Sequence, residues 1–227
     1  MESAASGASL LNGVLVTGHS HYTLEHPVID FTGYGGNDFA GWGAALMSTG
    51  DADVTVNHAQ IHTRGAVRTA VFVGGHSTMR VNDSEIYTES GALPAGYVEN
   101  LDLGLMKEVP WQLSLSGNVR ATNLVGNGTV YYTRSRIRSS GWGALSVDDS
   151  ARVRMVAKDC LIETLDSGYG AYSIGDSIDT FDHTTMNVAD YGLIMAGAGG
   201  GVFTNGSVVN SRRFGVMQFE RDGGGDL

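Results

Sequence analysis

Apolar and polar residues alternate along this chain in short runs, and glycine-rich turns separate the runs. Alternation with a period of two is typical of β-strands, because successive side chains point to opposite faces of a sheet. Each run is followed by an isolated apolar residue and then by another glycine, and this unit recurs about every 25 residues. The repeats cover 9–33, 41–65, 66–91, 118–141, 142–168, 169–192 and 193–215, with a partial repeat from 216.

Alignment of the repeats on their turns places similar residues in common columns. The turn column holds Gly18, Gly50, Gly75 and Gly126, and we place Asp149 and Asp176 at its next two positions. The members of the most regular apolar column are Ile29, Ile61, Ile86 and Ile137. Two further apolar columns hold Tyr22, Val54, Met79, Val130 and Val153, and then Leu24, Val56, Val81, Tyr132 and Met155.

Fixed columns at a fixed period predict that the strands stack in register as a parallel β-helix, in which neighbouring coils bury each other's apolar edges. An antiparallel sandwich is the alternative, but its alternate strands run in opposite directions and would not keep isoleucine and glycine in fixed columns. We therefore predict an all-β solenoid of about seven coils, forming one domain over 1–227 with an inserted loop at 92–117.

This pattern resembles the right-handed parallel β-helices of the pectin-lyase-like superfamily, whose coils have a similar length. The resemblance covers nearly the whole chain, and it implies a right-handed solenoid. It is a resemblance of architecture, and it transfers no chemistry. The chain begins without an obvious capping helix and ends at Leu227 within a coil. We expect a further segment, an unrecognised cap or a second copy in a homo-oligomer to cover the open ends, because exposed end strands invite pairing.

Composition narrows the range of partners. Glycine accounts for 33 residues and proline for only 3, which favours many tight turns over a disordered linker. The net charge of −10 repels phosphate backbones and anionic lipid, so we expect no nucleic-acid partner. Arg134, Arg136 and Arg138 form a local basic patch, which a solvated strand face explains equally well.

The location of the protein stays open at this level. No apolar run reaches the length of a membrane span, and the first residues lack the pattern of a signal peptide. The protein is extracellular if a signal peptide has been removed and cytoplasmic otherwise. The single cysteine, Cys160, lies in an apolar run, where we expect a buried spacer in preference to a nucleophile.

Two insertions interrupt the repeat, and insertions in a solenoid often mark its binding face. The longer one, 92–117, carries Tyr97 and Trp111. We expect it to fold back on the coils as a groove wall, with Trp111 either stacking on a sugar ring or anchoring the loop. The shorter insertion, 34–40, contains Asp38 and Phe39.

Acidic residues mark a second departure from the repeat. If Asp149 and Asp176 occupy one column of adjacent coils, they lie about 4.8 Å apart. Two such carboxylates share a proton or bind a cation, which suits a catalytic acid–base pair or a Ca²⁺ site. Asp148 precedes the first of them, and Arg152 is the nearest basic residue in sequence. The alternative is that these aspartates only cap the backbone of their turns.

The segment Val147-Asp148-Asp149-Ser150 is similar to the paired-aspartate segment of polygalacturonases, which share this fold. The remaining pattern of that family is missing, because Gly75-His76-Ser77 precedes the pair and Arg136-Ile137-Arg138 differs from its Arg-Ile-Lys. The activity is therefore not carried over.

Histidines share two further columns with acids, namely His19, Asp51 and His76, and His26, His58 and Asp83. A metal ion is one interpretation, since imidazole and carboxylate are ligands of Zn²⁺, Fe²⁺ and Mn²⁺. Hydrogen-bond ladders on a solvated face are the alternative, because a straight column does not converge on one point.

Three functions follow from these features. The first is a polysaccharide lyase or hydrolase that uses Asp148, Asp149 and Asp176 for catalysis and Tyr97, Trp111 and Arg152 for substrate binding. The second is a non-catalytic carbohydrate-binding or surface module. The third is a small-molecule lyase, isomerase or cyclase with a pocket between the 92–117 insertion and the Met47–Phe72 surface.

Overall fold

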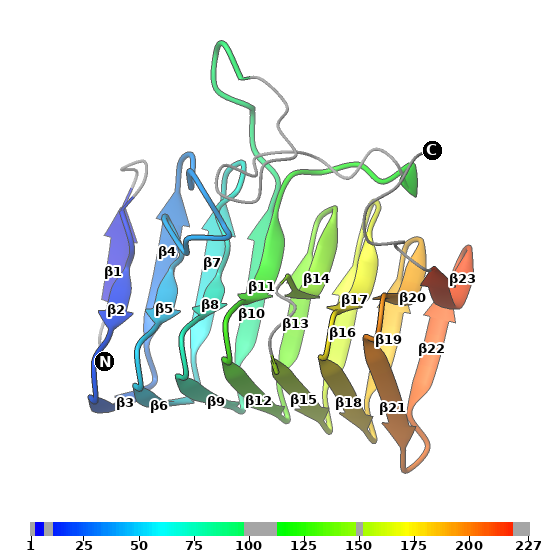
Figure 1. Cartoon of the computed structure of the whole chain (residues 1–227). Helices are drawn as coiled ribbons and strands as arrows, with labels where there is room; N and C mark the ends of the chain where they lie inside the picture. The colour runs from blue at the N-terminus through cyan, green and yellow to red at the C-terminus, as the bar shows by residue number, and fades with distance from the viewer. Residues whose placement is uncertain (1–2, 7–10, 98–112, 149–151, 220–227) are drawn as a thin grey trace.

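The structure of the protein is a computed structural model that describes residues 3–6, 11–97, 113–148 and 152–219. These residues form a right-handed parallel β-helix built from three parallel sheets (Figure 1). The chain passes through the three sheets in turn, and each strand pairs in parallel with the equivalent strand of the next coil. The predicted fold class is confirmed.

The sheets are named A, B and C. Sheet A contains β1 (Ser3–Ser6), β4 (Val28–Thr32), β7 (Gln60–Arg64), β10 (Glu85–Glu89), β13 (Arg136–Ser139), β16 (Leu161–Thr164), β19 (Thr185–Val188) and β22 (Val208–Ser211). Sheet B contains β2 (Val14–Val16), β5 (Leu46–Ser48), β8 (Val71–Val73), β11 (Arg120–Leu124), β14 (Gly143–Val147), β17 (Tyr169–Ile174), β20 (Tyr191–Ala196) and β23 (Phe214–Phe219). Sheet C contains β3 (His21–Glu25), β6 (Asp53–Asn57), β9 (Thr78–Asn82), β12 (Thr129–Thr133), β15 (Arg154–Lys158), β18 (Ile178–Asp182) and β21 (Gly200–Thr204).

The core lies between the three sheets and consists of the inward-facing residues of every coil. In sheet A, Ile86 pairs with Ile61 on one side and with Ile137 on the other, and all three are at most 2% exposed. The column begins at Ile29 and continues beyond Ile137 to Ile162. The predicted isoleucine column is therefore confirmed, and β-branched side chains suit it because they pack well on a pleated surface.

The predicted register is wrong in one coil. We expected Val153 and Met155 to continue the two apolar columns of sheet C, but Met155 pairs with Val130, and Ala157 pairs with Tyr132. The turn from β14 to β15 is two residues longer than the turn from β11 to β12, and this extra length shifts the register. The shift of two residues keeps the same face inward, so Val153 is still buried.

Glycines with positive φ make the turn from sheet B to sheet C, a corner that we call BC. Their φ angles lie between 62° and 71° at Gly18, Gly50, Gly75, Gly126, Gly175 and Gly197. This left-handed conformation favours glycine, because a Cβ would be strained there. The placement of Asp176 in this column is thus wrong, because Gly175 takes the position and Asp176 follows it. Asp149 lies outside the described residues.

The two insertions both leave the coils between sheet A and sheet B, at the corner that we call AB. Residues up to 97 rise away from the coil stack, and the described return segment, 113–119, runs back along the later coils (Figure 1). Leu115 is buried there in a cluster with Trp142, Tyr169 and Tyr191. For this segment, the prediction that the 92–117 insertion packs on the coils is confirmed.

Candidate functional site

The first predicted acid, Asp148, belongs to a buried ion cluster on the outer face of sheet B. It forms an ion pair with Arg120, which is only 1% exposed. The Arg120 Nε and Nη2 atoms also donate hydrogen bonds of 2.8 and 2.6 Å to Asp38 of the shorter insertion. Burial raises the pKa of Asp38, although Arg120 opposes this shift.

Aromatic rings enclose the same guanidinium group. The ring centroids of Phe39 and Trp142 lie 4.9 and 4.7 Å from the central carbon of Arg120, within cation–π range. The Asn123 amide donates a hydrogen bond to the backbone oxygen of Asp38. Because these groups are buried, we interpret the cluster as the anchor of the 34–40 insertion and not as a substrate site.

Of the other predicted site residues that the structure describes, Asp176 and Arg152 lie at one corner and Tyr97 lies at another. Asp176 is exposed at corner BC, in the position that Asp51 and His76 occupy on earlier coils, and Arg152 is exposed near the same corner. Tyr97 is half-buried in the insertion at corner AB, on the opposite side of sheet B. Asp149 and Trp111 lie outside the described residues, so the Asp149–Asp176 pair and the proposed Ca²⁺ site stay predictions.

The outer face of sheet A carries a different arrangement, an unbroken column of planar polar side chains. We call this column the polar strip. The residues of the strip pair directly from strand to strand and are half-buried or exposed. They are Asp30, His62, Tyr87, Arg138, Glu163, Asn187 and Asn210.

Stacking holds the middle of the polar strip in place. The His62 and Tyr87 rings are stacked with centroids 5.4 Å apart and an interplanar angle of 1°. The Arg138 guanidinium lies 4.8 Å from the centroid of the Tyr87 ring. Partial burial raises the pKa of Tyr87. The phenol therefore stays protonated at neutral pH and keeps its hydroxyl as a hydrogen-bond donor.

Ion pairs fix the charged side chains of this face. The His62 Nε2 atom lies 2.6 Å from Glu89, and Arg64 donates a hydrogen bond of 2.9 Å to the same carboxylate. The hydrogen bond from Arg64 is the largest cause that lowers the pKa of Glu89. Arg136 donates a hydrogen bond of 2.7 Å to Glu163 of the next coil. These contacts preorganise the face before any ligand binds.

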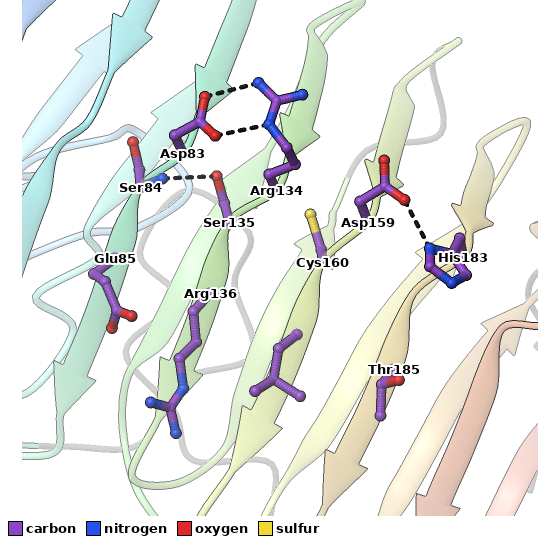
Figure 2. Close-up of a pocket in the computed structure, with 11 residues that line it drawn as sticks. Asp83, Ser84, Glu85, Arg134, Ser135, Arg136, Asp159, Cys160, His183 and Thr185 are labelled. Atoms are coloured by element: carbon purple, nitrogen blue, oxygen red, sulfur yellow. Dashed lines mark hydrogen bonds and ion pairs between the residues drawn. The ribbon is translucent and has the colours of Figure 1, made fainter.

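A hollow of about 570 Å³ lies beside the polar strip, at the corner from sheet C to sheet A that we call CA (Figure 2). Bidentate hydrogen bonds of 2.7 Å join Arg134 to Asp83 along one wall, and Asp159 lies 2.8 Å from His183 at the other end. The hydrogen bonds from Arg134 are the largest cause that lowers the pKa of Asp83. The remaining lining residues lie on the outer face of sheet A or at its edge. They are Ser84, Glu85, Ser135, Arg136, Cys160, Leu161 and Thr185.

Corner CA has an unusual backbone. Seven residues that are not glycine have φ between 48° and 54° there, a region that residues other than glycine seldom adopt and in which Asn, Asp and His are enriched. They are His26, His58, Asp83, Arg134, Asp159, His183 and Asn205. The predicted column of His26, His58 and Asp83 is thus confirmed and extends over every later coil. Backbone hydrogen bonds to the next coil hold the first six of these residues in this conformation.

A ladder of hydroxyl groups satisfies the backbone beneath corner CA. The N–H groups of Ala59 and Ser84 donate to the hydroxyls of Ser84 and Ser135, and the Cys160 N–H donates to Thr184. Cys160 occupies one step of this ladder, where it is buried and donates a hydrogen bond to the Lys158 carbonyl. Burial raises the pKa of its thiol to about 11. The prediction that Cys160 is buried is confirmed, and such a thiol is a poor nucleophile at neutral pH.

The histidine column at corner BC forms a hydrogen-bond ladder. The His19 Nδ1 atom lies 3.2 Å from Asp51, and His76 lies 3.7 Å from the same carboxylate and 3.0 Å from the amide of Asn127. Across the described ranges, no three histidine, cysteine or acidic side chains converge as metal ligands. These contacts run along the column from coil to coil, as expected for a ladder of polar side chains on a solvated face.

Sequence reasoning missed the polar strip, although the signal was present. Each of its members directly follows a member of the inward column, as His62 follows Ile61 and Tyr87 follows Ile86. The alternation that predicted the core therefore also fixed the opposite face, where each of the seven strip residues carries a planar polar group.

Comparison with protein-family models, with curated proteins and with solved structures found no match. The part of the chain that the structure describes contains no helix with the length and apolar character that a membrane crossing requires. The function must therefore be argued from the geometry of the surface.

Proposed function

We propose that this protein binds a polysaccharide lengthwise along the polar strip of sheet A. The observation that carries the proposal is that all seven positions of the strip hold planar hydrogen-bonding side chains in direct register. Carboxylate, amide, imidazole, phenol and guanidinium groups together provide donors and acceptors, and sugar hydroxyls act as both.

The dimensions of the strip suit a polymer. Strands of a sheet lie about 4.8 Å apart, so the seven positions extend over about 29 Å. The strip is open along its length, and the hollow of about 570 Å³ at corner CA adds depth beside its middle coils. A long, thin, hydroxyl-rich ligand contacts every step of such a surface, whereas a small molecule contacts only two or three.

Other ligand classes fit this face less well. The net charge of −10 opposes binding to nucleic acid. The central part of a protein interface is usually depleted of acidic residues, whereas Glu85 and Glu163 lie along the middle of this face.

The proposal predicts that the strip and not the solenoid surface in general binds the ligand. Tyr87→Ala removes the central ring of the strip, and we expect the affinity for the bound polysaccharide to fall about tenfold or more, which corresponds to about 1.4 kcal/mol. Tyr131→Ala is the matched control, because Tyr131 is also half-buried and faces outward, near Arg80, but on sheet C.

Affinity electrophoresis against a panel of soluble polysaccharides, followed by calorimetry with oligosaccharides, measures this difference. Both variants must first show wild-type melting temperatures. Equal losses of affinity in the two variants, or an absence of binding to any polysaccharide, would contradict the proposal.

A polysaccharide lyase or hydrolase of the pectin-lyase-like superfamily is the second proposal. The three parallel sheets support the superfamily, and the exposed carboxylate of Asp176 at corner BC supports an acid that is open to substrate. Asp149→Asn is expected to abolish the formation of product while leaving the melting temperature nearly unchanged. Assays for new reducing ends and for unsaturated products test this, and retained activity with a lower melting temperature would indicate a turn-capping aspartate.

A further inference from the structure

We infer that the ligand of the polar strip is an uncharged polysaccharide, and that polymers of sugar acids or sulfated sugars are excluded. This inference rests on the proposed function and specifies its substrate class. An anionic polymer requires basic side chains that are free to pair with it, so the state of each arginine on this face decides the question.

Every arginine of sheet A's outer face and of the adjoining hollow lies within ion-pair distance of a carboxylate, and all but Arg138 donate a hydrogen bond to it. Arg64 pairs with Glu89 at 2.9 Å, and Arg136 pairs with Glu163 at 2.7 Å. Arg138 lies 3.6 Å from Glu85 while its guanidinium also packs on the Tyr87 ring.

The hollow follows the same rule. Its wall residue Arg134 is held by both oxygens of Asp83, at 2.7 Å each. His183 lies against Asp159 at 2.8 Å. An anionic sugar entering the hollow would have to displace a protein carboxylate from each of these groups.

The balance of charge on this surface points the same way. This surface holds four arginines and six carboxylates. The arginines are Arg64, Arg134, Arg136 and Arg138, and the carboxylates are Asp30, Asp83, Glu85, Glu89, Asp159 and Glu163. The surface is therefore acidic even with all ion pairs formed, and the −10 charge of the whole chain adds to the repulsion of an anion.

The last coils of the strip carry no charge at all. Asn187 and Asn210 are joined by a hydrogen bond of 2.8 Å between their amides, and Thr185 lies beside them at the edge of the hollow. A ladder of side-chain amides keeps N–H donors and carbonyl acceptors for hydrogen bonds to sugar hydroxyls. It carries no charge that would attract a carboxylate. A neutral sugar chain can thus contact the full strip, whereas an anionic chain meets either repulsion or neutral groups.

The test compares a neutral and an anionic oligosaccharide of equal length. We expect the wild-type protein to bind neutral hexasaccharides, such as those of a xylan, glucan or mannan, with little dependence on salt. We expect no binding of a hexagalacturonate at low ionic strength, where electrostatic attraction would be strongest.

A variant that frees one arginine makes the inference sharper. Glu163→Gln removes the partner charge of Arg136, and we expect it to gain at least tenfold in affinity for hexagalacturonate at low salt, with the gain lost at high salt. Asp53→Asn is the matched control, because it frees Arg80 on sheet C, away from the strip, and should produce no gain.

The outcomes separate this inference from the proposed function. A wild-type protein that binds hexagalacturonate more tightly than every neutral oligosaccharide overturns the inference and leaves polysaccharide binding standing. A Glu163→Gln variant with no gain, or with the same gain as Asp53→Asn, also overturns it. If no oligosaccharide or polysaccharide of either charge binds, the proposed function fails and the inference fails with it.

Discussion

The side chains that point into this solenoid are mostly apolar, and Asp179 is an acidic residue among them. It occupies an inward column of sheet C, where its pairing partners are Met155 and Gly201. Its side chain is fully buried, and neither carboxylate oxygen has a hydrogen-bond partner in the ranges that the structure describes. Burial raises its pKa well above the ordinary value, so the folded state favours the neutral acid.

The position of Asp179 predicts an unusual pH dependence. Because its folded pKa is raised, the folded state binds the proton more tightly than the unfolded state does, and the Asp179 contribution to stability falls as the pH rises above about 3.9. Asp179→Leu should raise the free energy of unfolding at pH 7 by about 1–3 kcal/mol, the typical cost of an unsatisfied buried polar group. This gain should shrink as the pH falls towards 4.

Urea denaturation of the wild-type protein and the variant over pH 4–8 measures this effect. The difference between the two proteins isolates Asp179, because all other titrating groups are common to both. A gain of equal size at every pH would contradict the assignment.

Cys160 provides a second test at the scale of one residue. Cys160→Ser keeps both the donor and the acceptor of its step in the hydroxyl ladder, so we expect nearly unchanged stability. Cys160→Val removes the hydrogen bond from the thiol to the Lys158 carbonyl, which then keeps only the Arg134 N–H as a donor, and should cost about 1 kcal/mol. Chemical denaturation separates the two variants, and a larger loss in Cys160→Ser than in Cys160→Val would refute the ladder.

Among the elements, the 34–40 insertion is held by two buried arginines, Arg120 and Arg68, and Arg68 donates hydrogen bonds to the Gly33 and Tyr34 carbonyls. Arg120 forms ion pairs with both Asp38 and Asp148 and packs between Phe39 and Trp142. Arg120→Met should therefore lower the free energy of unfolding by about 3–5 kcal/mol, because it leaves two carboxylates uncompensated. Much of the loss should return in the triple variant that also carries Asp38→Asn and Asp148→Asn.

Limited proteolysis distinguishes a local from a global effect of Arg120→Met. We expect faster cleavage within 34–43 while the coils stay protected. Unchanged cleavage in this insertion would show that other contacts hold it.

On the scale of the whole molecule, stability is shared between adjacent coils, because each strand pairs only with the equivalent strands on either side. Ile86→Ala opens a cavity in the middle of the isoleucine column and should cost about 2–5 kcal/mol. Ile178→Ala is the control, because Ile178 is 53% exposed on the outer face of sheet C and should change stability by about 0.5 kcal/mol or less. Thermal and urea unfolding measure both, and similar losses would contradict the inward placement of Ile86.

The sequence by itself determined the alternating strands, the stacking of the coils in register and the inward isoleucine column of this protein. Each of these features is repeated on successive coils, so that one alternation and one period specify the pairing of Ile61, Ile86 and Ile137. The same alternation determined the opposite face of sheet A, although its polar strip becomes a surface only when the strands are stacked.

Only the tertiary structure decided the features that depend on segments distant in sequence or on a change of turn length. The longer turn after β14 shifted the coil that follows it, and Gly175 took the position expected for Asp176. Asp148 forms an ion pair with Arg120, which lies 28 residues before it, and the same arginine pairs with Asp38 of the shorter insertion.

The two Gly-Trp-Gly-Ala segments show why a local sequence cannot predict the burial of its side chains. Trp42 is 55% exposed, whereas Trp142 is 2% exposed beneath Leu115 and beside Arg120. The local sequence fixes the glycine-bounded turn in both places, since backbone conformation depends on neighbouring residues. Burial depends on which remote segment covers the side chain, and no local pattern carries that information.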